Sequence, residues 1–362
     1  MKTATHHREP LVHIVKRTDI STKKAVLIRA IAVIVSLLFS ALLVFVLKGI
    51  NPIQFFTALF EGAFGTSRRI WILLQKTAVL LCISLAVTPA FKMRFWNTGA
   101  EGQVLVGGLA TCACMYYLGG ALPLPLLYLL MIVSSIVAGI IWAVIPAIFK
   151  AKWNTNETLF TLMMNYVATF LVSFFINTWV TSGSGTLAPM SQYGLPRILN
   201  NWLLNIIIVA VLTVAVYIYL RFSKQGYEIS VVGESENTAR YIGINVKKVI
   251  IRTLIVSGAL CGVAGLILVG GTNHTIATDT VGGQGFTAIM VSWLGKFNPL
   301  FMVLTSFLVI FLEVGANQIS NAFKMNSSIS DIITAVILFF IIGCEFFINY
   351  KIMFRKAAKE DK

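Results

Sequence analysis

The sequence is poor in charged residues, and above all in acidic ones. Only 12% of its 362 residues are Asp, Glu, Lys or Arg, and 14 acidic residues stand against 29 basic ones. A soluble domain carries about 25% charged residues, so this chain has too little charge to cover a globule of its length with a water-facing surface. The shortage excludes a soluble enzyme, a nucleic-acid-binding protein and a disordered chain.

Cysteine and histidine are also scarce, and neither follows a metal-binding spacing. The five cysteines lie in or near apolar runs and are interpreted as small hydrophobic residues, and the four histidines form no zinc motif. The sequence lacks the Gly-x-x-x-x-Gly-Lys-[Ser/Thr] loop that binds ATP, and the Gly-x-Ser-x-Gly and His-Glu-x-x-His motifs of hydrolases. It therefore predicts no metal, no cofactor and no catalytic residues, and active transport would need energy from another chain or an ion gradient.

Long runs of apolar residues dominate the sequence. Hydrophobic residues make up 57% of the chain, and the mean hydropathy is +0.83. A helix needs about 20 apolar residues to cross a bilayer, so we predict an all-α polytopic membrane protein with about ten transmembrane helices. The eighth of them, at 286–297, is short and is either a half-helix or a span that begins in the glycines before it. The predicted spans are 25–47, 70–91, 102–119, 123–149, 159–180, 202–220, 253–271, 286–297, 300–317 and 329–349.

The distribution of Lys and Arg predicts the orientation of the chain. Basic residues gather in both ends of the chain and in the long loop at 221–252, and cytoplasmic segments carry the excess of such residues. Both termini are therefore expected in the cytoplasm, which requires an even number of crossings. The predicted organisation is a basic tail at 1–24, a membrane domain at 25–350 and a second basic tail at 351–362.

The loop at 221–252, called the coupling segment below, is the longest internal polar stretch. Gly226, Gly233 and Gly243 punctuate it and indicate a short helix between turns. A solvated connector is one interpretation. A loop of this length in a compact bundle is more often functional, so we favour a docking element for a cytoplasmic partner.

Two similar glycine motifs stand at the starts of the third and eighth predicted spans. They read Gly-Ala-Glu-Gly at 99–102 and Gly-Gly-Gln-Gly at 282–285, and each leads into an apolar run. The two spans are five crossings apart, and this odd offset turns the second copy upside down in the bilayer. Inverted repeats with interrupted helices are typical of transporters. The alternative is chance, because glycine is common in membrane helices.

Four strings resemble one family, the permease subunits of bacterial binding-protein-dependent ABC importers. The branch is the one that serves simple sugars, nucleosides and branched-chain amino acids. The strings are FWNTGAEGQVLVGG at 95–108, NETLFTLMMNYVA at 156–168, GYEISVVGESENTARYIGI at 226–244 and GFTAIMVSWLGKFNP at 285–299. The first of them is most similar to nucleoside-type permeases. The resemblance implies a BtuC-like importer architecture in the plasma membrane.

That resemblance also implies a function and partners. The chain would translocate a small polar solute, nucleosides first, with a simple sugar or a branched-chain amino acid as alternatives. ATP hydrolysis would occur on separate ATPase subunits, beside a second permease in a homo- or heterodimer and an extracellular solute-binding lipoprotein. The permease would perform no chemistry and bind no nucleic acid. Implied residues of the substrate pathway are Asn97, Glu101, Gln103 and Asn165, and those of coupling to the ATPase are Gly226, Gly233, Ala239, Arg240, Gly243 and Ile244.

Two other classes compete with this interpretation. An ion-coupled secondary transporter also uses inverted repeats, and its uptake would stop with an uncoupler and need no ATPase partner. A membrane-embedded enzyme would need a cluster of catalytic polar groups at one depth, and the sequence shows no evident cluster of that kind.

Overall fold

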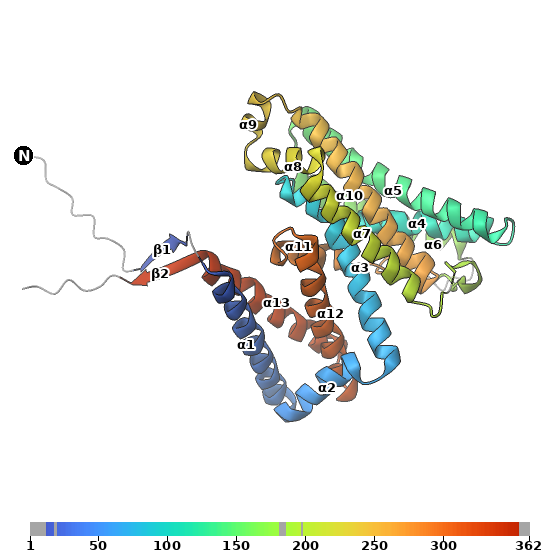
Figure 1. The fold of residues 1–362 in the computed structure, drawn as a ribbon. Helices are drawn as coiled ribbons and strands as arrows, with labels where there is room; N and C mark the ends of the chain where they lie inside the picture. Colours follow the sequence, from blue (N-terminus) through green and yellow to red (C-terminus); the bar gives the residue numbers. More distant parts are fainter. Residues whose placement is uncertain (1–11, 18–19, 181–185, 197, 355–362) are drawn as a thin grey trace, which may run out of the picture. The chain divides into compact units, whose positions relative to one another are not determined.

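The computed structural model describes residues 12–17, 20–180, 186–196 and 198–354 (Figure 1). In this part of the chain, eight helices are long and apolar enough to cross a membrane. An all-α polytopic membrane protein is thus confirmed. The outer parts of the two predicted basic tails, residues 1–11 and 355–362, lie outside the described residues.

The chain divides into two compact units, and the first contains both ends of the chain. It comprises residues 1–63 and 312–362. Strand β1 (Val12–Lys16) pairs antiparallel with β2 (Tyr350–Phe354). These strands lie within the predicted tails or directly beside them, and the sequence analysis did not foresee them, because a strand of five residues gains its stability from a partner that is remote in sequence.

Among the described residues, the first unit contains four helical segments, and an ion pair joins two of them. The four segments are α1 (Thr22–Lys48), α2 (Pro52–Phe64), the second part of α12 (Pro299–Ala322) and α13 (Ser327–Asn349). Arg29 of α1 donates from Nε to Oε1 of Glu345 of α13 at 2.8 Å. A charge within a membrane span is costly unless it is paired, so this contact fixes the register of α1 against α13. Helix α2 was not predicted, since its 13 residues are too few to span a bilayer.

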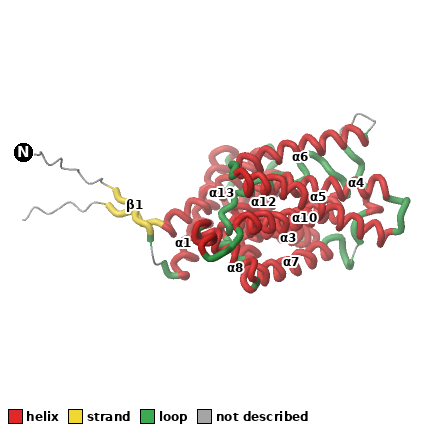
Figure 2. Tube along the Cα trace, turned by 90° about the horizontal axis from the view of Figure 1, so that it is seen from above, coloured by secondary structure: helices red, strands yellow, loops and turns green. Residues whose placement is uncertain are grey.

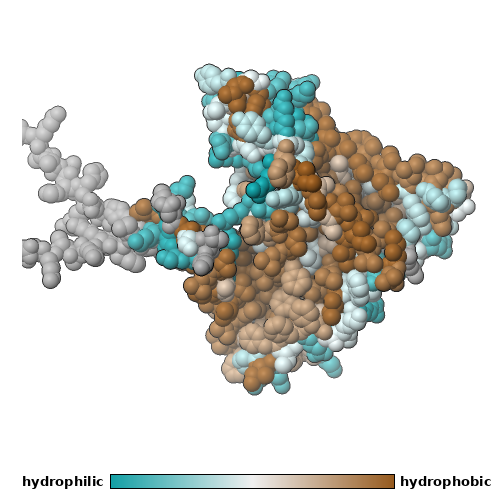
Figure 3. Space-filling view, in the orientation of Figure 1, coloured by the Kyte–Doolittle hydropathy of each residue, from teal (hydrophilic) through white to brown (hydrophobic). Residues whose placement is uncertain are grey.

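The second unit, residues 64–311, holds the remaining helices. In the most apolar stretches of α3 (Ser67–Lys92) and α10 (Val246–Leu268), 72% of the residues are buried. The corresponding share is 22–28% in α5 (Leu124–Trp153), α6 (Glu157–Trp179) and α7 (Leu203–Phe222). In Figure 2, α10 and α3 lie between α5 and α7, in agreement with the contacts among these helices. The apolar outer faces of this unit dominate the surface in Figure 3. Its helices are α3 (Ser67–Lys92), α4 (Ala100–Leu118), α5 (Leu124–Trp153), α6 (Glu157–Trp179), α7 (Leu203–Phe222), α8 (Lys224–Glu234), α9 (Glu236–Tyr241), α10 (Val246–Leu268) and α11 (Gln284–Leu294), with short turns of helix at Ser191–Tyr193 and Val269–Asn273 and the first part of α12.

Glycines let α10 approach its neighbours at backbone distance. A Cβ atom at Gly258 would lie 2.5 Å from the carbonyl oxygen of Gly139 in α5, and one at Gly262 would lie 2.3 Å from that of Ser135. Small residues of this kind allow helices to pack without a hydrophobic driving force in lipid. The pair therefore fixes α10 against α5 at the centre of this unit.

Each of the ten predicted spans corresponds to a helix of the structure. Eight of them coincide with the candidate membrane helices. The other two correspond to α4, which begins with the polar residues Glu101 and Gln103, and to α11, which has 11 residues. At 1.5 Å per residue, α11 is about 16 Å long, so the half-helix is the form that the eighth predicted span adopts.

Candidate functional site

The two glycine motifs meet in space through one carboxylate. Glu101, in the first turn of α4, accepts a hydrogen bond at Oε1 from the backbone N–H of Gly283 (2.8 Å) and another at Oε2 from that of Gly285 (2.7 Å). The first N–H groups of a helix have no partner within the helix, and negative charge is favourable there. Glu101 thus caps α11 from another helix. A Cβ at Gly285 would lie 2.5 Å from the backbone nitrogen of Glu101, so this approach needs glycine.

Two buried amides hold the start of α4 against α10. Asn97 accepts from Nε2 of Gln103 at 3.1 Å and donates to Oε1 of Gln103 at 3.3 Å. Its Nδ2 also lies 3.3 Å from Oγ of Ser257, near the middle of α10. Asn97 and Gln103 are at most 1% exposed. Because a buried polar group is costly without a partner, this reciprocal pair accounts for both amides.

A third amide ties the same segment to α6. Oδ1 of Asn165 accepts from the backbone N–H of Gly102, and its Nδ2 donates to the carbonyl oxygen of Thr98, both at 2.9 Å. The chain between α3 and α4 is irregular, and its backbone groups need partners within the protein at membrane depth. Asn165 provides two of them. We call Asn97, Glu101, Gln103 and Asn165 together the polar node.

From the polar node, α4 and α11 run in opposite directions. Along α4, Gly107 faces Gly262 and Gly108 faces Val269, toward the C-terminal end of α10. Along α11, Ser292 is hydrogen-bonded to Thr88 at 2.8 Å, toward the C-terminal end of α3. The node lies about 16 Å from that end, the length of α11, and the 19 residues of α4 extend about 28 Å in the other direction. Two helices that start at one place and run in opposite directions agree with the predicted inverted repeat.

All four residues predicted for the substrate pathway lie in this node. Asn97, Gln103 and Asn165 are buried and bonded within the protein, and Glu101 is partly exposed. Their role toward a solute stays a prediction. The sequence analysis missed Ser257, a lone serine in an apolar helix that carries no signal. It also gave no role to Gln284, whose Oε1 is buried and has no hydrogen-bond partner in the described part of the chain.

The coupling segment folds into α8 and α9, where a single short helix was expected. Its small residues face inward. A Cβ at Gly226 would lie 2.5 Å from the carbonyl oxygens of Tyr219 and Leu220, and one at Gly233 would lie 2.2 Å from that of Lys92. Ala239 is fully buried. Two of the six residues predicted for coupling, Gly226 and Gly233, therefore hold α8 against the ends of α7 and α3.

The residues that this segment offers to a partner lie around the end of α9. Arg240 is exposed and lies 3.3 Å from Glu236 in an i,i+4 ion pair. Tyr241 is 90% exposed and Ile242 is 55% exposed. Gly243 has φ +84°, a left-handed conformation that favours glycine, and it returns the chain to the partly buried Ile244. The motif highlighted Arg240, Gly243 and Ile244, whereas the exposure of Tyr241 and Ile242 became visible only in the fold.

The family of the chain follows from a comparison with family models. The model described as the permease component of branched-chain amino acid transport systems matches residues 69–342, more than half of the chain. The chain belongs to this family. It is the permease subunit of an ABC importer, and hence a multi-pass protein of the plasma membrane whose class is transport rather than catalysis.

Individual relatives cover most of the chain at modest identity. It is 29% identical over 326 residues to the guanosine ABC transporter permease protein NupP of Bacillus subtilis, covering 87% of this chain and 92% of that protein. Identity to the nucleoside ABC transporter permease protein NupB of Lactococcus lactis is 27% over 353 residues, with 93% and 95% covered. Identity to the glucose ABC transporter permease protein TsgB13 of Haloferax volcanii is 26% over 319 residues, with 84% and 83% covered.

Proposed function

We propose that the chain imports nucleosides. The observation that carries this proposal is its likeness to two permeases named for guanosine and nucleosides over almost their entire lengths. A pair of aromatic rings near the C-terminal end of α11 supports it. Trp96, next to Asn97, is 46% exposed, and its ring lies 5.8 Å from that of Trp293, which is 50% exposed. Half-exposed indole rings offer faces on which a nucleobase stacks.

The partners and the orientation are part of the same proposal. We expect separate ATPase subunits, a second permease and an extracellular solute-binding lipoprotein, in keeping with the family. Both termini are proposed to be cytoplasmic, with the coupling segment on the same side. The pairing of β1 with β2 supports the placement of the termini on one side of the membrane, because it holds residues 12–16 beside residues 350–354.

The proposed mechanism is alternating access. Movement of the ATPase subunits would be received at Arg240, Tyr241 and Ile242. It would then pass to the end of α3 through the close contact of Gly233 with Lys92. Since Thr88 of α3 is bonded to Ser292 of α11, and α11 is capped by Glu101, a displacement of α3 reaches the polar node through contiguous contacts. Domain movements of this kind rest on packed elements that adopt discrete arrangements.

Uptake by reconstituted vesicles tests the proposal. Vesicles that contain the permease with its ATPase subunits and binding protein should accumulate guanosine and other nucleosides when ATP is supplied, and an uncoupler should leave uptake unchanged. A panel with glucose and leucine identifies the solute class. Uptake of the sugar or the amino acid alone would contradict the nucleoside proposal, and uptake without ATPase subunits would contradict coupling to ATP.

A simple sugar is the second candidate. The likeness to TsgB13, a permease named for glucose, covers 84% of the chain at nearly the same identity. Sugar recognition relies on hydroxyl and amide groups rather than on stacking alone. Competition for nucleoside uptake by an excess of glucose separates the two candidates, because a nucleoside site should not be displaced by it.

Substitution of Tyr241 by alanine should weaken the binding of the ATPase subunit about 30-fold. Truncation of an aromatic hot-spot residue costs about 2 kcal/mol, and a tenfold change corresponds to about 1.4 kcal/mol. The side chain is 90% exposed, so the melting temperature of the isolated permease should stay the same. Binding of the purified ATPase to the permease in detergent measures the effect.

Tyr166 provides the matched control. It is 57% exposed on α6, outside the coupling segment, and Tyr166→Ala should leave ATPase binding unchanged. Equal binding by the Tyr241 and Tyr166 variants would show that the end of α9 is not the docking surface.

A further inference from the structure

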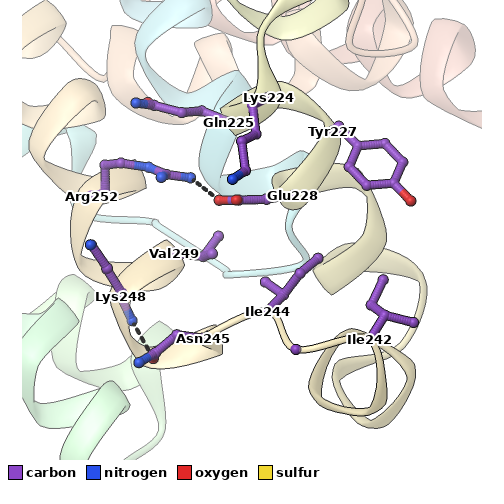
Figure 4. A pocket seen from close by; sticks show the side chains of 11 residues that line it. Lys224, Gln225, Tyr227, Glu228, Ile242, Ile244, Asn245, Lys248, Val249 and Arg252 are labelled. Carbon is purple, nitrogen blue, oxygen red and sulfur yellow. Dashed lines mark hydrogen bonds and ion pairs between the residues drawn. The ribbon is translucent and has the colours of Figure 1, made fainter.

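A pocket of about 740 Å³ lies between α8 and the first turns of α10 (Figure 4). Its walls come from Lys224 and Glu228 on one side and from Lys248 and Arg252 on the other, and the backbone at 242–245 forms a third wall. Arg240 and Tyr241 are not among the lining residues that the structure describes, but Ile242 is. The pocket therefore adjoins the exposed end of α9.

The pocket carries an excess of positive charge. Nη2 of Arg252 donates to Oε2 of Glu228 at 2.7 Å, which neutralises one cation with the one carboxylate of the lining. Lys224 and Lys248 are both exposed and remain for a ligand. In addition, Nε of Arg252 is buried and has no hydrogen-bond partner among the described residues. The two ammonium groups at one cavity provide charged donors for a phosphate group.

The position of the pocket along the helices places it at the border of the membrane. Helix α7, a candidate span, ends at Phe222, two residues before Lys224. Lys248 and Arg252 lie in the first two turns of α10, another candidate span. Figure 3 shows hydrophilic residues gathered over α8 and α9 beside the hydrophobic surface of the bundle. Groups at this level contact lipid headgroups.

Exposed apolar side chains form a continuous row along α7 that ends next to the pocket. The large apolar side chains exposed on this helix follow helical spacing, so they share one face, and that face suits acyl chains. Its last member, Phe222, stands beside the pocket-lining residues Lys224 and Gln225 in sequence. The members are Ile207, Val211, Val214, Ile218 and Phe222, each between 46% and 71% exposed.

We propose that this pocket binds the headgroup of an anionic phospholipid, with the phosphate between Lys224 and Lys248 and the acyl chains along α7. Basic pockets at the cytoplasmic ends of membrane helices bind acidic headgroups. Because α8 carries the pocket on one side and the Gly233 contact with α3 on the other, the lipid would brace the coupling segment against α10. This inference does not depend on the identity of the transported solute.

Native mass spectrometry of the purified full-length permease tests the proposal. The protein is titrated with phosphatidylglycerol or phosphatidylcholine in detergent. The wild type should bind one phosphatidylglycerol at least tenfold more tightly than phosphatidylcholine. Lys224→Gln and Lys248→Gln should each weaken phosphatidylglycerol binding about fivefold, the contribution of one lysine near an acidic headgroup, and the double variant about 25-fold.

Lys247→Gln is the matched control, because Lys247 is the exposed neighbour of Lys248 and is absent from the described lining of the pocket. It removes the same charge and should change binding less than twofold. An equal loss in the Lys247 and Lys248 variants, or equal binding of the two lipids, would overturn the proposal. Displacement of the lipid by millimolar inorganic phosphate would overturn it as well, since the occupant would then be a soluble phosphate. Binding is measured without transport, so failure here is distinct from failure of the nucleoside proposal.

Discussion

Replacement of Glu101 by alanine is expected to lower the free energy of unfolding by about 3 kcal/mol and to abolish uptake. The carboxylate accepts two backbone hydrogen bonds, from Gly283 and Gly285, and each hydrogen bond to a charged group is worth about 1.5–3 kcal/mol. Alanine would leave both N–H groups without this partner within the bundle and would release the start of α11. Denaturant unfolding in mixed micelles, together with vesicle uptake, measures both effects.

Two further variants define what Glu101 does. Glu101→Gln keeps one carbonyl oxygen but turns an NH₂ group toward the second N–H, so it should lose roughly half of that stability. Glu236→Ala is the control, because its exposed i,i+4 pair with Arg240 is worth about 0.5 kcal/mol. If Glu101→Ala were as stable as the wild type and still failed to transport, Glu101 would act on the solute and not as a cap of α11.

Replacement of Gly233 by alanine is expected to reduce uptake to less than a tenth. The new methyl group would lie 2.2 Å from the carbonyl oxygen of Lys92, so α8 must move away from the end of α3. Overpacking of this kind costs about 1–3 kcal/mol, and the displaced α8 would no longer transmit movement to α3. Uptake and ATP hydrolysis by the reconstituted transporter measure the loss, which should appear as ATP hydrolysis that is no longer coupled to uptake.

Gly343→Ala is the matched control for Gly233→Ala. Gly343 lies in α13, and no heavy atom of the described residues lies within 4 Å of its Cβ position. This variant should transport normally and gain up to about 1 kcal/mol, since alanine is the better helix former. Normal coupling in the Gly233 variant would contradict the role given to the contact between α8 and α3.

Gly233 is an example of a residue whose packing the sequence did not predict. Its motif predicts a coupling element, and the sequence correctly predicts helical structure there. The motif does not say whether a glycine faces a partner or the protein's own core. The structure shows Gly226 and Gly233 packed inward, whereas Arg240 of the predicted set is exposed, as are Tyr241 and Ile242 outside it. The direction in which Gly233 faces depends on Lys92 at the end of α3, which is remote in sequence.

By itself, the sequence determined the class of protein, the ten helices that its apolar runs predict, and the glycine motifs that open α4 and α11. The sequence predicts these properties because hydropathy and helix-breaking glycines depend on residues that are neighbours along the chain. The tertiary structure alone decided how the polar groups are paired. Glu101 finds its partners more than 180 residues away, at Gly283 and Gly285, because in a bilayer each buried polar group must be satisfied by whichever segment the fold brings to the same depth.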